Sequence, residues 1–271
     1  MIRKRYRAGI LGFAAGLVPA CVLAQGGPTD WADIEGRIQY AYYTNDARAL
    51  NALLTSLKPK AAEGEAAPAS DLSTRAYFRA LTHYRLAQVL ISTQKSKAKD
   101  AIDDCGDEID NAVDALPKVP LGLDESDEGR RQRAEDFALA TACTLAGREM
   151  SSMPFGGGRI GSRIDEAVKL EPKNPRVRLV EALAAFDRAG KDAAEQAAAL
   201  KKLRAVTQMF ETARAGASTI PEWGAAEAYA FLGRALYDQR DVVGAREALE
   251  RSLLIAPDYA FARNLMAKIT R

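Results

Sequence analysis

The sequence predicts an all-α fold made of stacked helical hairpins. The composition, with 48% apolar and 27% charged residues, is that of an ordered globular chain. Alanine is abundant, whereas runs of valine, isoleucine and threonine at strand spacing are absent, which favours helices. Apolar residues recur at i, i+3, i+4 and i+7, as on the buried face of an amphipathic helix. Short polar turns and prolines separate these segments and mark where helices end.

The clearest pair of helical segments lies within residues 226–259. Its apolar or small stripe positions are Tyr229, Leu232, Gly233 and Leu236, then Ala245, Leu249 and Ser252, with Pro257 after the second segment. We expect a turn at 238–241 between the two helices, with Asp241 capping the second one. Gly233 and Ala245 are small where paired helices come closest, so they predict a tight helix–helix contact.

This pattern resembles the tetratricopeptide repeat (TPR), a helix–turn–helix unit of about 34 residues that reads W-x2-L-G-x2-Y, A-x3-F and P. Residues 28–61 match it again, through Trp31, Ile34, Ile38, Ala47, Leu54 and Pro59, although Glu35 and Asn51 depart in residue type. The resemblance implies an irregular TPR-like solenoid of about five helical hairpins over residues 25–271. Residues 258–270 are expected to form a capping helix at its end.

Two further copies of the pattern occupy the middle of the chain. One joins Tyr77–Tyr84 to Cys105–Pro117, with the two halves 12 residues further apart than in the last unit, which predicts an insertion or a helix extension near 93–97. The other joins Leu139–Ala146 to Ile160–Pro172 through a glycine connector at 156–158. Residues 175–215 are expected to form another helical pair without the repeat pattern. Residues 60–70 and 119–130 are expected to be loops.

The first 24 residues resemble a secretory signal peptide. Arg3, Lys4, Arg5 and Arg7 precede an uncharged stretch that ends in the small-residue cleavage pattern at Ala24. Cleavage would remove four positive charges from a formal net charge of +2, which leaves 2 − 4 = −2. The expected location is periplasmic or secreted. A retained anchor is one alternative, although the stretch is short for a membrane span. A lipoprotein lipidated at Cys21 is another.

Two cysteines remain after such cleavage, Cys105 and Cys143. An even pair in an oxidising compartment is a disulfide candidate. Two separate small buried residues are the other interpretation, and the sequence does not decide between them.

No motif in the sequence indicates catalysis. His83 is the single histidine, which excludes two-histidine metal sites. No nucleophile motif surrounds it. The string Gly156-x-Gly158-x-x-Gly161 has the spacing of a dinucleotide loop, but it follows a predicted helix rather than a strand. The acidic pairs near residues 103–108 flank apolar stripes, as a solvated helix face does. We therefore expect no enzyme activity, no cofactor and no metal.

The TPR resemblance implies a concave groove lined by the first helix of each pair. By that analogy the groove carries the following candidates: Arg75, Phe78, Thr82, Arg85, Glu227, Arg234, Tyr237 and Asp238. Ala230 and Arg234 do not reproduce the Lys/Asn clamp that some TPR proteins use for a C-terminal carboxylate. The expected function is a protein–protein interaction scaffold or adaptor in the cell envelope with a protein or peptide partner. A small-ligand-binding or transporter-associated protein is the alternative. Nucleic acid and a membrane span after signal cleavage are not expected.

Overall fold

The structure is a computed structural model that describes residues 30–58, 69–116, 126–150, 157–214 and 223–270. The chain divides into two units, Met1–Asp30 and Trp31–Arg271, and the helices of the described residues belong to the second. The signal-like residues 1–24, Cys21, Pro59 and Pro117 lie outside the described residues.

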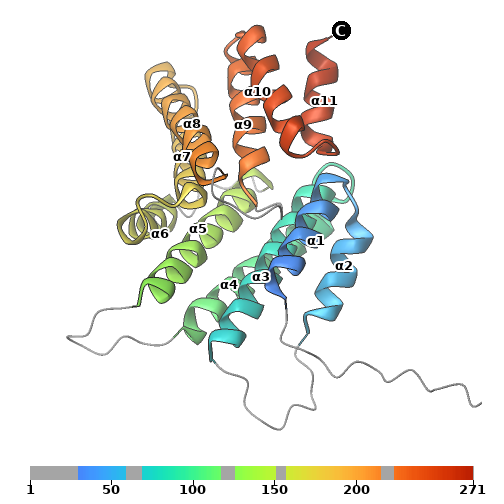
Figure 1. Ribbon diagram of the computed structural model, residues 1–271, viewed down its shortest axis with the longest axis vertical. Helices are drawn as coiled ribbons and strands as arrows, with labels where there is room; N and C mark the ends of the chain where they lie inside the picture. The colour runs from blue at the N-terminus through green and yellow to red at the C-terminus, as the bar shows by residue number, and fades with distance from the viewer. Residues whose placement is uncertain (1–29, 59–68, 117–125, 151–156, 215–222, 271) are drawn as a thin grey trace, which may run out of the picture. The chain divides into compact units, whose positions relative to one another are not determined.

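Within the described residues the chain forms eleven α-helices (Figure 1). Their bounds are α1 Trp31–Tyr43, α2 Ala47–Ser56, α3 Ala69–Leu90, α4 Lys95–Ala115, α5 Asp127–Met150, α6 Gly157–Leu170, α7 Pro175–Ala189, α8 Ala193–Arg214, α9 Ala225–Asp238, α10 Val242–Ile255 and α11 Ala260–Ile269. They pair as five hairpins followed by α11, so the all-α class, the number of hairpins and the final helix are confirmed.

Side-chain caps fix where several helices begin. Asp46 accepts hydrogen bonds from the backbone N–H groups of Arg48 and Ala49 at 3.0 and 2.9 Å before α2. Asp241 accepts one from the N–H of Gly244 at 2.9 Å before α10, which confirms the predicted cap. Such bonds satisfy N–H groups that have no partner inside the helix.

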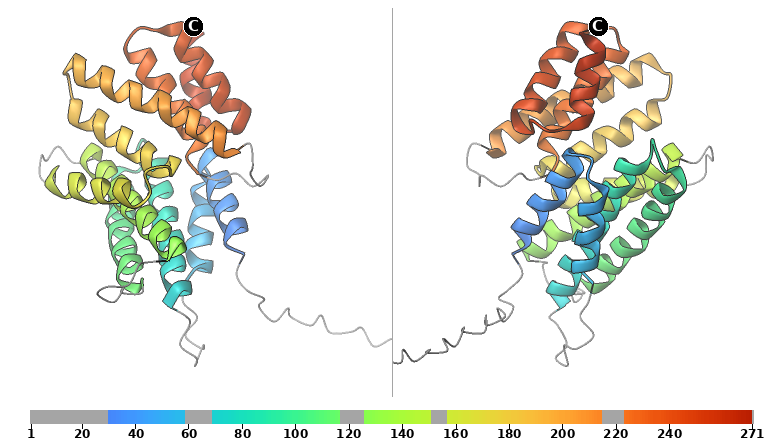
Figure 2. Two further views of the ribbon diagram at one scale, coloured as in Figure 1. Left: turned by 60° about the vertical axis from the view of Figure 1, so that its left-hand side comes forward. Right: turned by 90° about the vertical axis from the view of Figure 1, so that its right-hand side faces the viewer.

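Each hairpin packs on the next one along the chain (Figures 1 and 2). The first helices of the first four hairpins are in consecutive contact, α1 with α3, α3 with α5 and α5 with α7. The fifth hairpin departs from this order, because α9 packs mainly on α8, α10 and α11. The stack is therefore irregular, as predicted, and it changes direction before α9.

The fifth hairpin has the close helix contact that its sequence predicts. A Cβ atom at Gly233 would lie 2.8 Å from Leu249 Cγ and 3.1 Å from the carbonyl oxygen of Ala245. Ser252 Oγ donates a hydrogen bond to the carbonyl oxygen of Ala226 at 2.8 Å, which ties α10 to α9. Gly233, Ala245, Leu249 and Ser252, which belong to the TPR pattern, thus lie at the hairpin interface.

The structure corrects several segment boundaries. The extra length between Tyr77 and Cys105 is a helix extension, because α3 and α4 have 22 and 21 residues where α9 and α10 have 14 each. Residues 127–130 belong to α5 rather than to a loop, and 69–70 belong to α3. The glycine connector is wrong beyond residue 156, since α6 begins at Gly157 and includes Gly158 and Gly161.

Cys105 of α4 and Cys143 of α5 are joined by a disulfide, with their Cα atoms 6.2 Å apart. The bond lies at the contact between the second and third hairpins, and both residues are buried. The structure therefore favours the disulfide over two separate thiols.

The buried apolar residues form two clusters. The larger runs along the stack from Ile34 in α1 to Ala248 in α10. The smaller joins Tyr42 and Tyr43, at the end of α1, to residues of α9, α10 and α11, including Tyr259 and Leu265. The first hairpin therefore shares a core with the last one. None of the helices in the described ranges is both long and apolar enough to cross a bilayer.

Candidate functional site

A buried ion pair joins the second hairpin to the last one. Arg85 of α3 and Glu227 of α9 are 2% and 1% exposed, and Nη2 of Arg85 donates to Oε1 of Glu227. Burial alone would lower the pKa of Arg85, but the Glu227 carboxylate and the neighbouring tyrosines together more than offset this, so the pKa lies above its ordinary value. Each side chain depends on the other as its partner, because neither meets water.

Four residues, from the end of α1 and from the turns before α9 and α11, surround this pair. Tyr43 Oη and the backbone N–H of Gly224 each donate to Oε2 of Glu227, at 2.9 and 3.0 Å. The guanidinium carbon of Arg85 lies 4.2 Å from the ring centre of Tyr42, a cation–π distance. The hydroxyl groups of Tyr42 and Tyr259 are 2.8 Å apart and share a hydrogen bond. We call Tyr42, Tyr43, Arg85, Glu227 and Tyr259 the closure network.

The turn before α9 is shaped to deliver Glu227 to this network. Gly224 has φ of 112°, a conformation that other residues rarely adopt. A Cβ atom there would also lie 2.6 Å from the Phe210 ring. Only glycine therefore fits without a shift at the point where the N–H meets the Glu227 carboxylate.

A second polar layer lies beside the first and is centred on Trp223. Its backbone N–H donates to Glu35 Oε1 at 2.9 Å, and its indole N–H donates to Tyr77 Oη at 2.9 Å. Glu135 Oε2 accepts from Arg176 Nη1 at 2.8 Å and from Tyr77 Oη at 3.2 Å. Glu35, which departs from the small residue expected in the TPR pattern, thus contacts the Trp223 turn.

The two layers hold the last hairpin against α1 and α3. Tyr42 and Tyr259 are 217 residues apart in sequence and Trp223 and Glu35 are 188 apart. The helical stack curves far enough for its first and last hairpins to meet. An open groove along the inner helices is therefore replaced by a shorter cleft.

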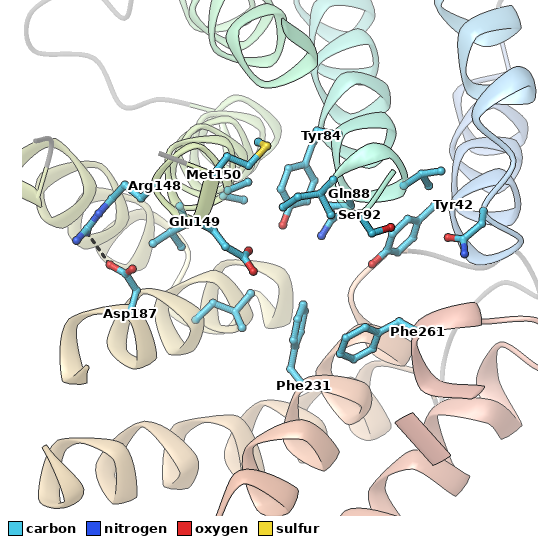
Figure 3. Close-up of a pocket in the computed structure, with 18 of the residues that line it drawn as sticks. Tyr42, Tyr84, Gln88, Ser92, Arg148, Glu149, Met150, Asp187, Phe231 and Phe261 are labelled. Carbon is cyan, nitrogen blue, oxygen red and sulfur yellow. Dashed lines mark hydrogen bonds and ion pairs between the residues drawn. The ribbon is translucent and has the colours of Figure 1, made fainter. Parts of the chain in front are cut away.

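The cleft has a volume of about 770 Å³ and lies beside the closure network (Figure 3). Its aromatic lining residues are Tyr42, Tyr84, Phe231, Tyr259 and Phe261. Its polar lining residues are Asn45, Gln88, Ser92, Arg148, Glu149, Asp187 and Asn264. Gln88 also accepts a hydrogen bond from Arg85 Nη1 at 2.8 Å, which connects the cleft wall to the network. Aromatic walls with a few polar groups are typical of binding sites.

The cleft is lined by more acidic than basic side chains. Arg148 Nη1 and Asp187 Oδ2 are 2.6 Å apart at the rim and neutralise each other. Figure 3 shows the Glu149 carboxylate pointing into the cavity between Tyr84 and Phe231, whereas Arg148 points toward Asp187. Glu149 is solvent-exposed. The lining thus has one carboxylate in excess.

The tyrosines around the cleft stay neutral at physiological pH. Burial is the main reason that the pKa values of Tyr42, Tyr84 and Tyr259 lie above the ordinary tyrosine value. They act as hydrogen-bonding, electron-rich rings rather than as acids. Within the described residues, no group of three or more histidine, cysteine or carboxylate side chains is placed to hold a metal ion.

His83 lies outside the cleft. It is 8% exposed, and its Nδ1 is 3.5 Å from Asp104 Oδ2 on α4. Burial lowers the pKa of His83. Its place at the α3–α4 contact agrees with a packing residue.

The structure places four of the predicted binding residues in the interior. Phe78, Thr82, Arg85 and Glu227 are at most 7% exposed, so the expectation that they face an open groove is wrong for them. Thr82 donates to the Phe78 carbonyl oxygen of its own helix at 2.6 Å. The physical reason is the closure of the stack, which brings α9 and the Trp223 turn onto the inner face of α3.

The other predicted binding residues keep some exposure but do not line the cleft. Arg75 pairs with Asp71 at 3.2 Å on α3, and its guanidinium carbon lies 5.9 Å from the Trp31 ring centre. Arg234 pairs with Asp238 at 2.8 Å on the exposed side of α9. Tyr237 is half-buried. A binding role for these four residues stays a prediction.

Sequence reasoning missed most of the cleft. Tyr84 was identified as a repeat position, but Tyr42, Glu149, Phe231 and Phe261 were not singled out. The TPR spacing indicates the inner helices from which they come. It does not indicate that α11 and the end of α1 meet, and that contact creates the cavity.

Comparisons with known proteins give limited further information. No family model matches the sequence, and no curated protein matches it. Among solved structures, the chain is similar to the crystal structure of YrrB, described as a TPR protein with an unusual peptide-binding site. The match has 17% sequence identity and a TM-score of 0.38, and it covers 83% of this chain and 92% of that chain. The two chains superpose loosely.

Proposed function

We propose that this chain is a non-enzymatic binding protein that holds a segment of a partner polypeptide in the cleft between its inner helices. The observation that carries the proposal is the cleft itself, about 770 Å³ in volume and walled by aromatic residues of α1, α3, α9 and α11. Aromatic side chains supply much of the binding energy at protein interfaces.

The contacts that hold the walls of the cleft in place also support a binding role. Its walls are held by the buried Arg85–Glu227 pair and by the Tyr42–Tyr259 hydrogen bond. A preformed site loses less conformational entropy when it binds than a mobile one does. The polar groups along the rim, among them Asn45, Ser92 and Asn264, can bond to the backbone of an extended segment.

The proposed location is the cell envelope. The N-terminal sequence has the layout of a signal peptide. A disulfide between Cys105 and Cys143 fits an oxidising compartment, where such bonds persist. Fractionation of cells expressing the tagged chain tests this: recovery in the cytosol at full precursor mass would contradict export.

Site-directed photo-crosslinking tests the binding proposal. A benzophenone amino acid is placed at Phe231, in the cleft, or at Val243, which is exposed on α10. We expect a discrete crosslinked polypeptide from position 231 and none of the same mass from position 243. Equal crosslinking from both positions, or none from either in intact cells, would contradict binding in the cleft.

A small-molecule ligand is the second candidate. The cleft volume falls within the range of small-molecule sites, about 300–1,000 Å³, and the closed stack leaves the site more compact than an open groove. Native mass spectrometry of the chain purified from cells distinguishes the two. A constant added mass below about 1 kDa, which is lost in a Phe231→Ala variant, would favour this candidate over a polypeptide.

A further inference from the structure

We infer that the cleft selects a basic segment: it receives a lysine or arginine side chain of the partner polypeptide, with Glu149 as the counter-charge. This inference rests on the proposed function and adds the chemistry of the partner. It follows from three features of the cleft, namely its net charge, the helix ends that surround it and its aromatic rings.

The first feature is the excess carboxylate. Among the charged lining residues, Arg148 and Asp187 neutralise each other at 2.6 Å. Behind the wall, Arg85 is neutralised by Glu227 and does not repel a second cation strongly. Glu149 remains, exposed and aimed into the cavity, with no cation of the described chain at ion-pair distance (Figure 3).

The second feature is the direction of the helices. The lining residues Tyr42, Gln88, Glu149 and Asp187 lie in the last turns of α1, α3, α5 and α7 respectively. The C-terminal end of a helix carries a partial negative charge and favours cations. One helix, α11, presents its N-terminal turn to the cleft through Phe261 and Asn264. Four negative ends therefore oppose one positive end.

The position of Glu149 is unfavourable for its own helix. A carboxylate in the last turn of α5 is repelled by the partial negative charge at that end of the helix. Folding alone gives no reason for an acid there. A cationic ligand in the cleft would remove the repulsion.

The third feature is the set of aromatic rings around Glu149. Tyr84 and Phe231 lie on either side of its carboxylate in Figure 3, and Phe231 and Phe261 have ring centres 6.0 Å apart. Aromatic faces attract ammonium and guanidinium groups within about 6 Å. The rings also cover the apolar stem of a lysine or arginine side chain. An acidic segment would meet Glu149, the helix ends and the ring faces, which all oppose it.

The test uses three pools of fluorescein-labelled random peptides whose central residue is fixed as lysine, norleucine or glutamate. Binding to the full chain is measured by fluorescence anisotropy at low salt. We expect the lysine pool to bind up to about fivefold more tightly than the norleucine pool, the upper end for one exposed ion pair, and the glutamate pool to bind weakest. Glu149→Lys should reverse the ranking of the lysine and glutamate pools. Glu247→Gln, a change at an exposed acid on α10, should leave it unchanged.

The outcomes separate the two proposals. Equal binding of all three pools that is lost in Phe231→Ala would overturn the charge selection and keep the polypeptide-binding function. No binding of any pool would overturn both. Butylamine is added as a competitor, and its own affinity for the cleft is measured. If butylamine binds as tightly as the lysine pool and displaces it, the site takes a small free cation and the proposed polypeptide partner is wrong. Because Glu149 makes no ion pair in the described chain, its variants are expected to fold.

Discussion

Replacing Glu227 by glutamine tests how strongly the closure network holds the fold. The change keeps the size of the side chain but removes the charge opposite Arg85, which is 2% exposed. Breaking a buried ion pair on one side costs about 3–5 kcal/mol, because the remaining charge has lost its partner and is not hydrated. Tyr43 and Gly224 also donate to this carboxylate. We therefore expect Glu227→Gln to lower the free energy of unfolding by about 3–5 kcal/mol, a large part of the stability of most domains.

Urea unfolding at pH 7, followed by circular dichroism, measures this loss. The double variant Arg85→Met/Glu227→Gln should recover part of it, since no unpaired charge is then buried. Arg234→Met is the control: it breaks the exposed pair with Asp238, whose side chains are 55% and 53% exposed, and should cost less than about 0.5 kcal/mol. A Glu227→Gln variant that is as stable as the Arg234→Met variant would refute the reasoning.

Three more perturbations test other parts of the structure. Burial raises the pKa of Asp136 from 3.8 to about 7, so the folded chain keeps a proton that the unfolded chain loses above about pH 4. Stability should then fall by up to about 4 kcal/mol as the pH rises from 4 to 7, and urea titrations of Asp136→Asn should lack this component. Gly233→Ala should destabilise by about 1–3 kcal/mol, because its Cβ would meet Leu249 and a backbone oxygen. Gly106→Ala is the control, because the Cβ would enter open space, and it should stabilise the fold by about 0.5–1 kcal/mol. Thermal unfolding measures both variants. Reducing the Cys105–Cys143 bond, which spans 38 residues, should cost about 2–4 kcal/mol in a calorimetric comparison with the oxidised chain.

Local features of the fold were predictable because they depend on residues close in sequence. The turn at Asp241, the small contact at Gly233 and the end of α10 before Pro257 all follow from spacing within one hairpin. The extra 12 residues in the second unit were harder to place. A polar stretch such as 93–97 is compatible with either an insertion or longer helices, and packing of α3 on α4 decides for the second.

The site was less predictable because it depends on the curvature of the whole stack. The hydrogen bond between Tyr42 and Tyr259 joins residues at opposite ends of the described chain. Curvature accumulates from small rotations at each hairpin contact, and sequence spacing does not determine them. The same closure explains why Arg85 and Glu227, expected on an exposed face, are buried. The TPR analogy places both residues on the groove, whereas in the structure they pair with each other.

The contact between the first and last hairpins can be measured most directly by nuclear Overhauser effects between tyrosine rings. In a tyrosine-labelled sample, Tyr42→Phe and Tyr259→Phe variants assign the two ring signals. The ring centres of Tyr42 and Tyr259 are 5.4 Å apart, nearly the same as the 5.5 Å between the sequence neighbours Tyr42 and Tyr43. The account predicts cross-peaks of similar strength for both pairs. A Tyr42–Tyr43 cross-peak without any Tyr42–Tyr259 cross-peak would show an open stack and would contradict the closed cleft.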